Sequence, residues 1–153
     1  LTPASKSEAI IAKTIAYLVT SLLQIQLIMG ILILVYNYQP AGPYFQLVLC
    51  LLIIAFFGIV LGIFISVVSN SRLQANQYFI FAFLSLLVIE LAVPVADVRN
   101  ANPLHMAREA IVNIASRGLP FYDAMPPILG ILAVSLAFFV SALAVFSVKK
   151  TLV

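Results

Sequence analysis

The stretch YFQLVLCLLIIAFFGIVLGIFISVV, residues Tyr44 to Val68, contains no charged side chain. A helix rises about 1.5 Å per residue, so about 20 apolar residues cross the hydrocarbon core of a bilayer. This run meets that length, whereas a strand of a membrane barrel needs only about 9–11 residues. The stretch therefore predicts a membrane-spanning α-helix.

The composition extends this conclusion to the whole chain of 153 residues. Hydrophobic residues make up 64% and charged residues 8%, and the mean hydropathy is +1.19. A soluble domain has about 25% charged residues, so most of this surface is expected to face lipid. The Lys and Arg residues form no cluster that could follow a phosphate backbone, so nucleic acid is not an expected partner. Cys50, the only cysteine, is expected to be a small buried hydrophobic side chain.

Three further apolar runs have the length of membrane spans. The spans predicted are residues 15–36, 44–68, 78–95 and 127–148. The sequence PAGP at Pro40–Pro43 separates the first two, and the polar stretch SNSRLQANQ separates the second from the third. Backbone polar groups at this depth must bond to one another, so the spans are helices. We expect an all-α polytopic membrane helical bundle, one transmembrane domain over residues 1–153.

Basic residues predict the orientation of the bundle. With four spans, one side carries Lys6, Lys13, Arg72, Lys149 and Lys150. The other side carries Arg99, Arg108 and Arg117, which acidic residues accompany. The excess of basic residues places both termini in the cytoplasm. This predicts an integral protein of the inner or plasma membrane.

The connection between the third and fourth spans contains a predicted short external amphipathic helix. Asn102 can cap it, Pro103 suits its first position and Gly118 suits its end. Its apolar residues recur at helical spacing, at Leu104, Ala107, Ile111 and Ile114, while His105, Arg108, Glu109, Asn113 and Ser116 fall elsewhere. Such a helix is expected to lie at the outer water–lipid boundary or to pack across the span ends, and it could be a lid without a specific role.

Polar and small residues inside the spans are candidates for function or packing. Gln24 and Gln26 lie about 200° apart on a helix, so both cannot face one cavity. One could line a substrate path while the other joins a neighbouring helix, or both could hydrogen-bond between helices. Gly58 and Gly62 form a small-xxx-small pair that allows close helix approach, for which a subunit interface is a candidate location.

Glu90 is the acidic residue of the third span. A carboxylate at the centre of a bilayer costs about 2.5–3.5 kcal/mol on insertion scales, so Glu90 is a candidate for the substrate path. The alternative is an acid at the headgroup level that pairs with Arg99 or Arg108 or is protonated.

No group of residues predicts bond-making catalysis. His105 is the only histidine, and no cysteine or carboxylate stands at metal-ligand spacing from it. No Gly-rich phosphate-binding loop is present. We therefore expect no enzyme activity, no metal site and no cofactor bound directly by this chain.

Three motifs, in order along the chain, resemble ABC-2 type transporter permeases, the transmembrane subunits of ABC exporters. The first is a Thr-Pro-x-Ser-x-x-Glu pattern with a following Lys, matched by Thr2, Pro3, Ser5, Glu8 and Lys13. The second is a Leu-Gly turn with a following Ser and Gln-Ala, matched by Leu61, Gly62, Ser66, Gln74 and Ala75. The third is Asn-Pro-Leu with a closing Gly, matched by Asn102, Pro103, Leu104 and Gly118. The chain departs from the family at Glu90, which stands near a position where the family usually has Gly.

The resemblance implies that this chain is the C-terminal four-span portion of a six-span permease. Residues Thr2 to Lys13 would then form a short cytoplasmic coupling helix that fits an ABC ATP-binding subunit, and that partner would hold ATP and Mg. A second permease copy, identical or different, would complete a dimer that exports a lipid, glycan, drug or similar amphiphile. The rival hypothesis is a small non-transporting integral membrane subunit that scaffolds a larger complex.

Overall fold

The computed structural model describes residues 6–148, and every element in this range is helical. The elements are α1 (Lys6–Tyr36), α2 (Tyr44–Val68), α3 (Arg72–Ala92), α4 (Ala96–Asn100), α5 (Pro103–Ile111), the π-helical turn η1 (Val112–Ser116) and α6 (Met125–Val148). Four of them, α1, α2, α3 and α6, are long and apolar enough to cross a membrane. The predicted all-α membrane bundle is confirmed.

The span boundaries match the predictions at α2 and shift at the other helices. α3 begins at Arg72 because the Ser71 hydroxyl oxygen accepts a hydrogen bond from the Gln74 backbone N–H at 3.1 Å and caps the helix. It ends at Ala92 because the ring of Pro94 disfavours a helical conformation at the residue before it. α6 begins two residues earlier than predicted, at Met125.

The predicted separate coupling helix is not present as its own element. α1 runs without a break from Lys6 to Tyr36, because this segment has no proline and its first glycine is Gly30. Its 31 residues measure about 45 Å, which exceeds the roughly 30 Å hydrocarbon core. The first turns of α1 therefore extend the span beyond the hydrocarbon. Thr2, Pro3 and Ser5 lie outside the described residues.

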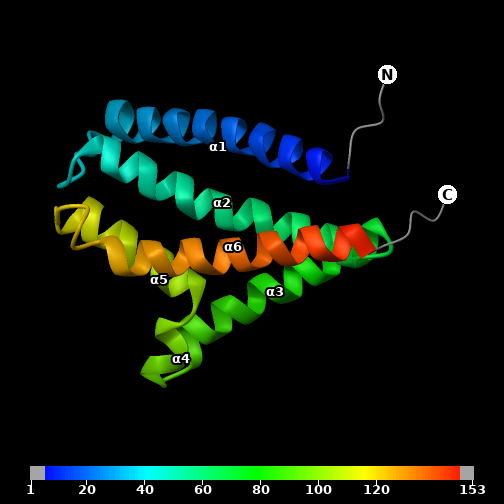
Figure 1. Ribbon diagram of the computed structural model, residues 1–153. Coiled ribbons are helices and arrows are strands. Elements are labelled where there is room, and N and C mark those ends of the chain that lie inside the picture. The colour runs from blue at the N-terminus through cyan, green and yellow to red at the C-terminus, as the bar shows by residue number, and fades with distance from the viewer. Residues whose placement is uncertain (1–5, 149–153) are drawn as a thin grey trace.

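Helix α2 lies at the centre of the bundle. It packs against α1, α3, α5 and α6, and its most extensive contact is with α6. The N-terminal end of α1, the connection between α2 and α3 and the C-terminal end of α6 lie at the same end of the bundle (Figure 1). The basic residues Lys6 and Arg72 therefore share one side, as the four-span topology requires.

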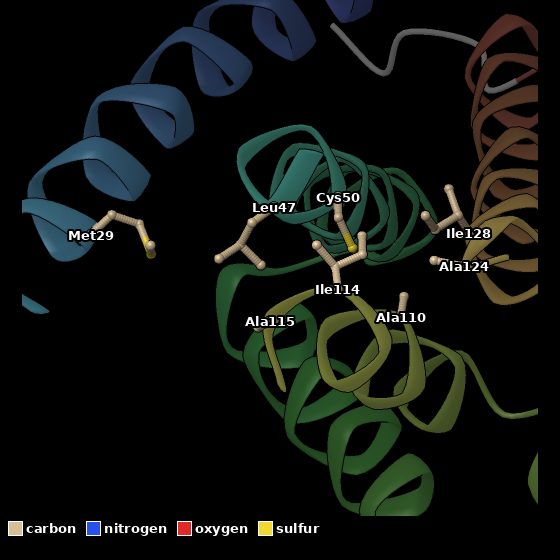
Figure 2. Close-up of a cluster of buried hydrophobic side chains, with 8 residues drawn as sticks. All are labelled: Met29, Leu47, Cys50, Ala110, Ile114, Ala115, Ala124 and Ile128. Atoms are coloured by element: carbon tan, nitrogen blue, oxygen red, sulfur yellow. The ribbon is translucent and has the colours of Figure 1, made fainter. Parts of the chain in front are cut away.

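The buried core lies toward the opposite end of the bundle. It consists of Met29, Leu47, Cys50, Ala110, Ile114, Ala115, Ala124 and Ile128. Figure 2 shows Ile114 pointing toward Cys50 of α2, with Ile128 on the adjoining α6 and Ala124 in the turn just before it. The alanines let α5 and η1 approach α2 and α6 closely, and Cys50 is buried as predicted.

The predicted amphipathic helix between the third and fourth spans is confirmed. The Asn102 side chain caps α5, Pro103 is its first residue, and Gly118 follows with φ +63°. The helix packs against the spans, since Ala110 and Ile114 are completely buried. Asn113, expected on the polar face, is buried because the π-helical turn adds a residue and rotates the following side chains.

The connection from α3 to α6, which contains α5 and η1, is called the returning segment here. The loop between α1 and α2 contacts the end of this segment. The Ala41 backbone N–H donates to the Ala115 carbonyl at 2.9 Å. A Cβ atom placed on Gly42 would lie 2.5 Å from the Ile114 carbonyl oxygen, so only glycine fits there. This close contact joins the loop between α1 and α2 to η1, in the connection that precedes α6.

Gly42→Ala tests this contact. The added methyl collides with backbone rather than with a flexible side chain, so we expect the free energy of unfolding to fall by about 1–3 kcal/mol. The measurement is equilibrium unfolding of the purified full chain in mixed micelles. Gly30→Ala is the matched control because nothing lies within 4 Å of its Cβ position. Equal stability of the two variants would contradict the tight contact.

Candidate functional site

A buried acid forms the centre of a polar cluster in the half of the bundle away from the N-terminal end of α1, and we call this half the outer half. The Glu90 side chain is only 10% exposed and lies in the last turns of α3. Its Oε2 and Oε1 atoms lie 2.9 and 3.1 Å from Nδ1 of His105, whose side chain is 12% exposed. Nη1 of Arg108 lies 3.6 Å from Oε1, and the Arg108 side chain remains 70% exposed. We call Glu90, His105 and Arg108 the outer polar cluster.

An asparagine at the start of α5 brings these side chains together. The Asn102 side-chain amide donates from Nδ2 to the Leu86 carbonyl at 2.8 Å, and its Oδ1 accepts from the Leu104 N–H at 3.1 Å. Leu86 is one turn before Glu90, so the bond fixes the start of α5 beside the correct face of α3. His105 and Arg108 are three residues apart and project from one face of α5. The cap thus positions both partners of Glu90.

The arrangement stabilises a carboxylate at a place poor in water. A carboxylate only accepts hydrogen bonds, so His105 donates from Nδ1. Arg108 adds a positive charge at the rim, where solvent weakens its effect. The cluster therefore brings one acidic side chain into contact with two basic side chains of α5. It contains no nucleophile and no oxyanion site.

An open cavity of about 480 Å³ adjoins the outer polar cluster. Its lining residues are Ile54, Leu87, Glu90, Leu104, Ala107, Arg108, Ile111 and Val112. The volume falls in the range of sites for small organic molecules. Its walls are apolar apart from the acid and the arginine, so it suits an apolar group with a polar end.

The structure places one of the two predicted basic partners beside Glu90. Arg108 lies within ion-pair distance, whereas no ion pair joins Glu90 to Arg99 within residues 6–148. Sequence reasoning did not predict His105 as a partner of Glu90; it considered this residue as part of the polar face of the helix and as a possible metal ligand. The available signal was that His105 precedes Arg108 by three residues, which places both on the same helical face.

The two glutamines of α1 differ in their surroundings. The Tyr44 hydroxyl at the start of α2 donates to Oε1 of Gln26, so Gln26 joins neighbouring helices. Gln24 is exposed and lines a groove between α1 and α2. Neither glutamine lines the cavity beside Glu90, so the structure does not unite the three residues predicted for a substrate path.

The residues predicted for coupling lie on α1, and those predicted for helix packing lie on α2. Glu8 and Lys13 are exposed residues in the first turns of α1. Nothing lies within 4 Å of a Cβ atom placed on Gly58 or Gly62. No other helix in the described part of the chain therefore packs closely on this pair, and its contact with a second subunit stays a prediction.

Comparison of the chain with protein-family models, curated proteins and solved structures finds no match. Among residues 6–148, no three His, Cys, Asp or Glu side chains lie close enough together to hold a metal ion. The site is therefore defined by its own geometry, as a buried acid–histidine pair in a membrane bundle.

The pairing of Glu90 with His105 predicts a measurable coupling. Glu90→Leu should lower the free energy of unfolding by about 1–3 kcal/mol, because the buried imidazole N–H loses its acceptor. A double-mutant cycle with His105→Leu should give a coupling energy of about 0.5–3 kcal/mol, measured by unfolding in mixed micelles. The exposed Glu109→Gln is the control and should change stability by less than about 0.5 kcal/mol. A coupling energy near zero would contradict a stabilising pair.

Proposed function

We propose that this chain is a membrane-spanning part of an ATP-driven ABC-2 type permease. In this proposal it exports a lipid, glycan, drug or similar amphiphile and works as a dimer with a second permease copy. An ABC ATP-binding subunit supplies ATP hydrolysis with Mg. The proposal rests on the three family-like motifs that occur in order along the chain.

Two of these motifs have a physical role at helix boundaries, which supports the proposal. Asn102 and Pro103 start α5, and Gly118 follows its end with a positive φ angle. Gln74 follows the cap of α3, where its Oε1 atom accepts from the Asn70 backbone N–H at 2.8 Å. These residues therefore determine where helices begin and end. Their match to the family pattern is a match in the positions of helix boundaries.

The shape of α1 suggests how force would enter the bundle. Its first turns, with Glu8 and Lys13, continue the span as one rigid helix. A subunit that pushes on these turns would tilt α1 as a lever, without an intervening hinge. In this proposal, the N-terminal end of α1 takes the coupling role that was predicted for a separate surface helix.

The outer polar cluster is suited to hold the bundle in one state of a transport cycle. Glu90 belongs to α3, whereas His105 and Arg108 belong to α5. A relative movement of α3 and α5 would separate Glu90 from His105 and Arg108. The anionic end of a cargo molecule could then take the place of Glu90 beside these two side chains. Two discrete arrangements of this kind are the usual basis of alternating access.

The orientation can be tested by cysteine labelling on sealed cells. Gln39→Cys lies in the exposed loop between α1 and α2, and Asn70→Cys lies in the loop between α2 and α3. A membrane-impermeant maleimide should label Gln39→Cys directly and Asn70→Cys only after permeabilisation. Cys50 is buried and provides the unlabelled background. The reverse pattern would contradict cytoplasmic termini.

Cross-linking from the first turns of α1 tests the transporter proposal. Glu8→Cys, treated with a short bifunctional maleimide in native membranes, should give an adduct with an ATP-binding subunit identified by mass spectrometry. Tyr36→Cys, at the other end of α1, is the matched control and should give no such adduct. Absence of the adduct from an intact purified complex would favour the scaffold hypothesis.

A further inference from the structure

An open groove of about 880 Å³ lies between α1 and α2, far from the outer polar cluster. One wall is a stripe of α1 that contains Lys13, Tyr17, Thr20, Ser21 and Gln24. The other wall is α2, where Gly58, Gly62 and Ser66 recur every fourth residue. We call this feature the inner groove, because its α1 wall begins at Ile10, near the end of the bundle where α2 connects to α3 (Figure 1).

The α1 wall presents hydrogen-bond donors at increasing depth. The span begins at Ile10, so Lys13 lies in its first turn and Gln24 lies about 16 Å farther along the helix. Thr20 donates to the Ala16 carbonyl at 2.9 Å. Lys13, Tyr17 and Gln24 are exposed side chains on this wall. Their donors are therefore accessible to a partner that enters the groove.

The α2 wall is smooth and leaves room for an apolar occupant. The positions of a Cβ on Gly58 and on Gly62 face open space. Ala55, Ile59 and Ile63 complete an apolar surface beside them. An extended hydrocarbon chain fits such a surface, because it can lie along the backbone where no side chain projects.

We propose that the inner groove binds an anionic glycerophospholipid of the adjoining leaflet. The Lys13 ammonium would pair with the phosphate, and the Tyr17 hydroxyl, about one turn farther along α1, would bond to an ester oxygen. The acyl chains would lie on Gly58 and Gly62. The order of groups along the groove, from a charge to a hydroxyl to an apolar surface, matches the order of phosphate, ester and acyl chain along the lipid.

Charge favours this occupant over a helix from a second copy of the chain. No acidic residue lines the groove, so Lys13 has no counterion there. A copy of α2 would bring an uncharged wall, and a copy of α1 would bring two lysines, Lys6 and Lys13, with the single acid Glu8, so its net charge is positive like that of the groove. Basic pockets between spans on the cytoplasmic side bind anionic headgroups in membrane proteins. The inference does not depend on the transport function.

Photolabelling of the purified full chain in phosphatidylcholine nanodiscs tests the site. The probes are phosphatidylglycerol and phosphatidylcholine, each with a diazirine on one acyl chain, and mass spectrometry locates the labelled peptides. We expect phosphatidylglycerol to label α1 and α2 at the groove. Lys13→Gln should reduce its preference over phosphatidylcholine by about fivefold.

Gly62→Leu fills the groove and should abolish this labelling, whereas Gly30→Leu is the matched control and should retain it. Both glycines have open space at Cβ, but Gly30 does not line the groove. If Gly62→Leu loses helical circular dichroism, Lys13→Gln and Ser66→Leu replace it. Undiminished labelling in folded groove variants would overturn the proposal. A disulfide-linked dimer of Gly58→Cys would also overturn it, because a second copy would then occupy the groove.

Discussion

The hydrocarbon core of a bilayer offers no water to backbone N–H and C=O groups, and the architecture of this chain depends on that constraint. Regular helices satisfy it along the four long spans. The returning segment between α3 and α6 is the exception, because its helix begins beside Leu86, inside the length of α3. There Asn102 supplies both a donor and an acceptor, and the Ala115 carbonyl at the far end receives the Ala41 N–H. The irregular backbone is thus tied to protein partners at both ends.

Close packing around α2 follows from the same condition. Lipid is as apolar as the helices, so the bundle is held by shape and hydrogen bonds more than by removal of apolar surface from water. Alanines at 110, 115 and 124 let α5, η1 and α6 come close to Leu47 and Cys50. Gly42 extends this closeness to the first loop. Around Leu47 and Cys50 the helices are consequently packed closely, whereas α1 and α2 enclose an open groove nearer the other end of the bundle.

Two groups of polar side chains differ in their surroundings. Glu90, His105 and Arg108 are paired within the chain at the outer end. At the inner end, the exposed side chains of Lys13 and Gln24 line an open groove. The first arrangement suits a contact that can open and reform, and the second suits an external ligand. The two ends of the bundle would therefore take part in different interactions.

The sequence by itself determined the number, type and approximate limits of the spans, because run length and charge decide membrane insertion without tertiary information. It also determined the capped helix at Asn102 and Pro103, since a cap depends on neighbouring residues. Tertiary structure alone decided that Glu90 meets His105 and that Gly58 and Gly62 face open space. These features depend on rotation of helices about their axes and on their separation. Hydropathy does not specify either quantity when nearly every face of a span is apolar.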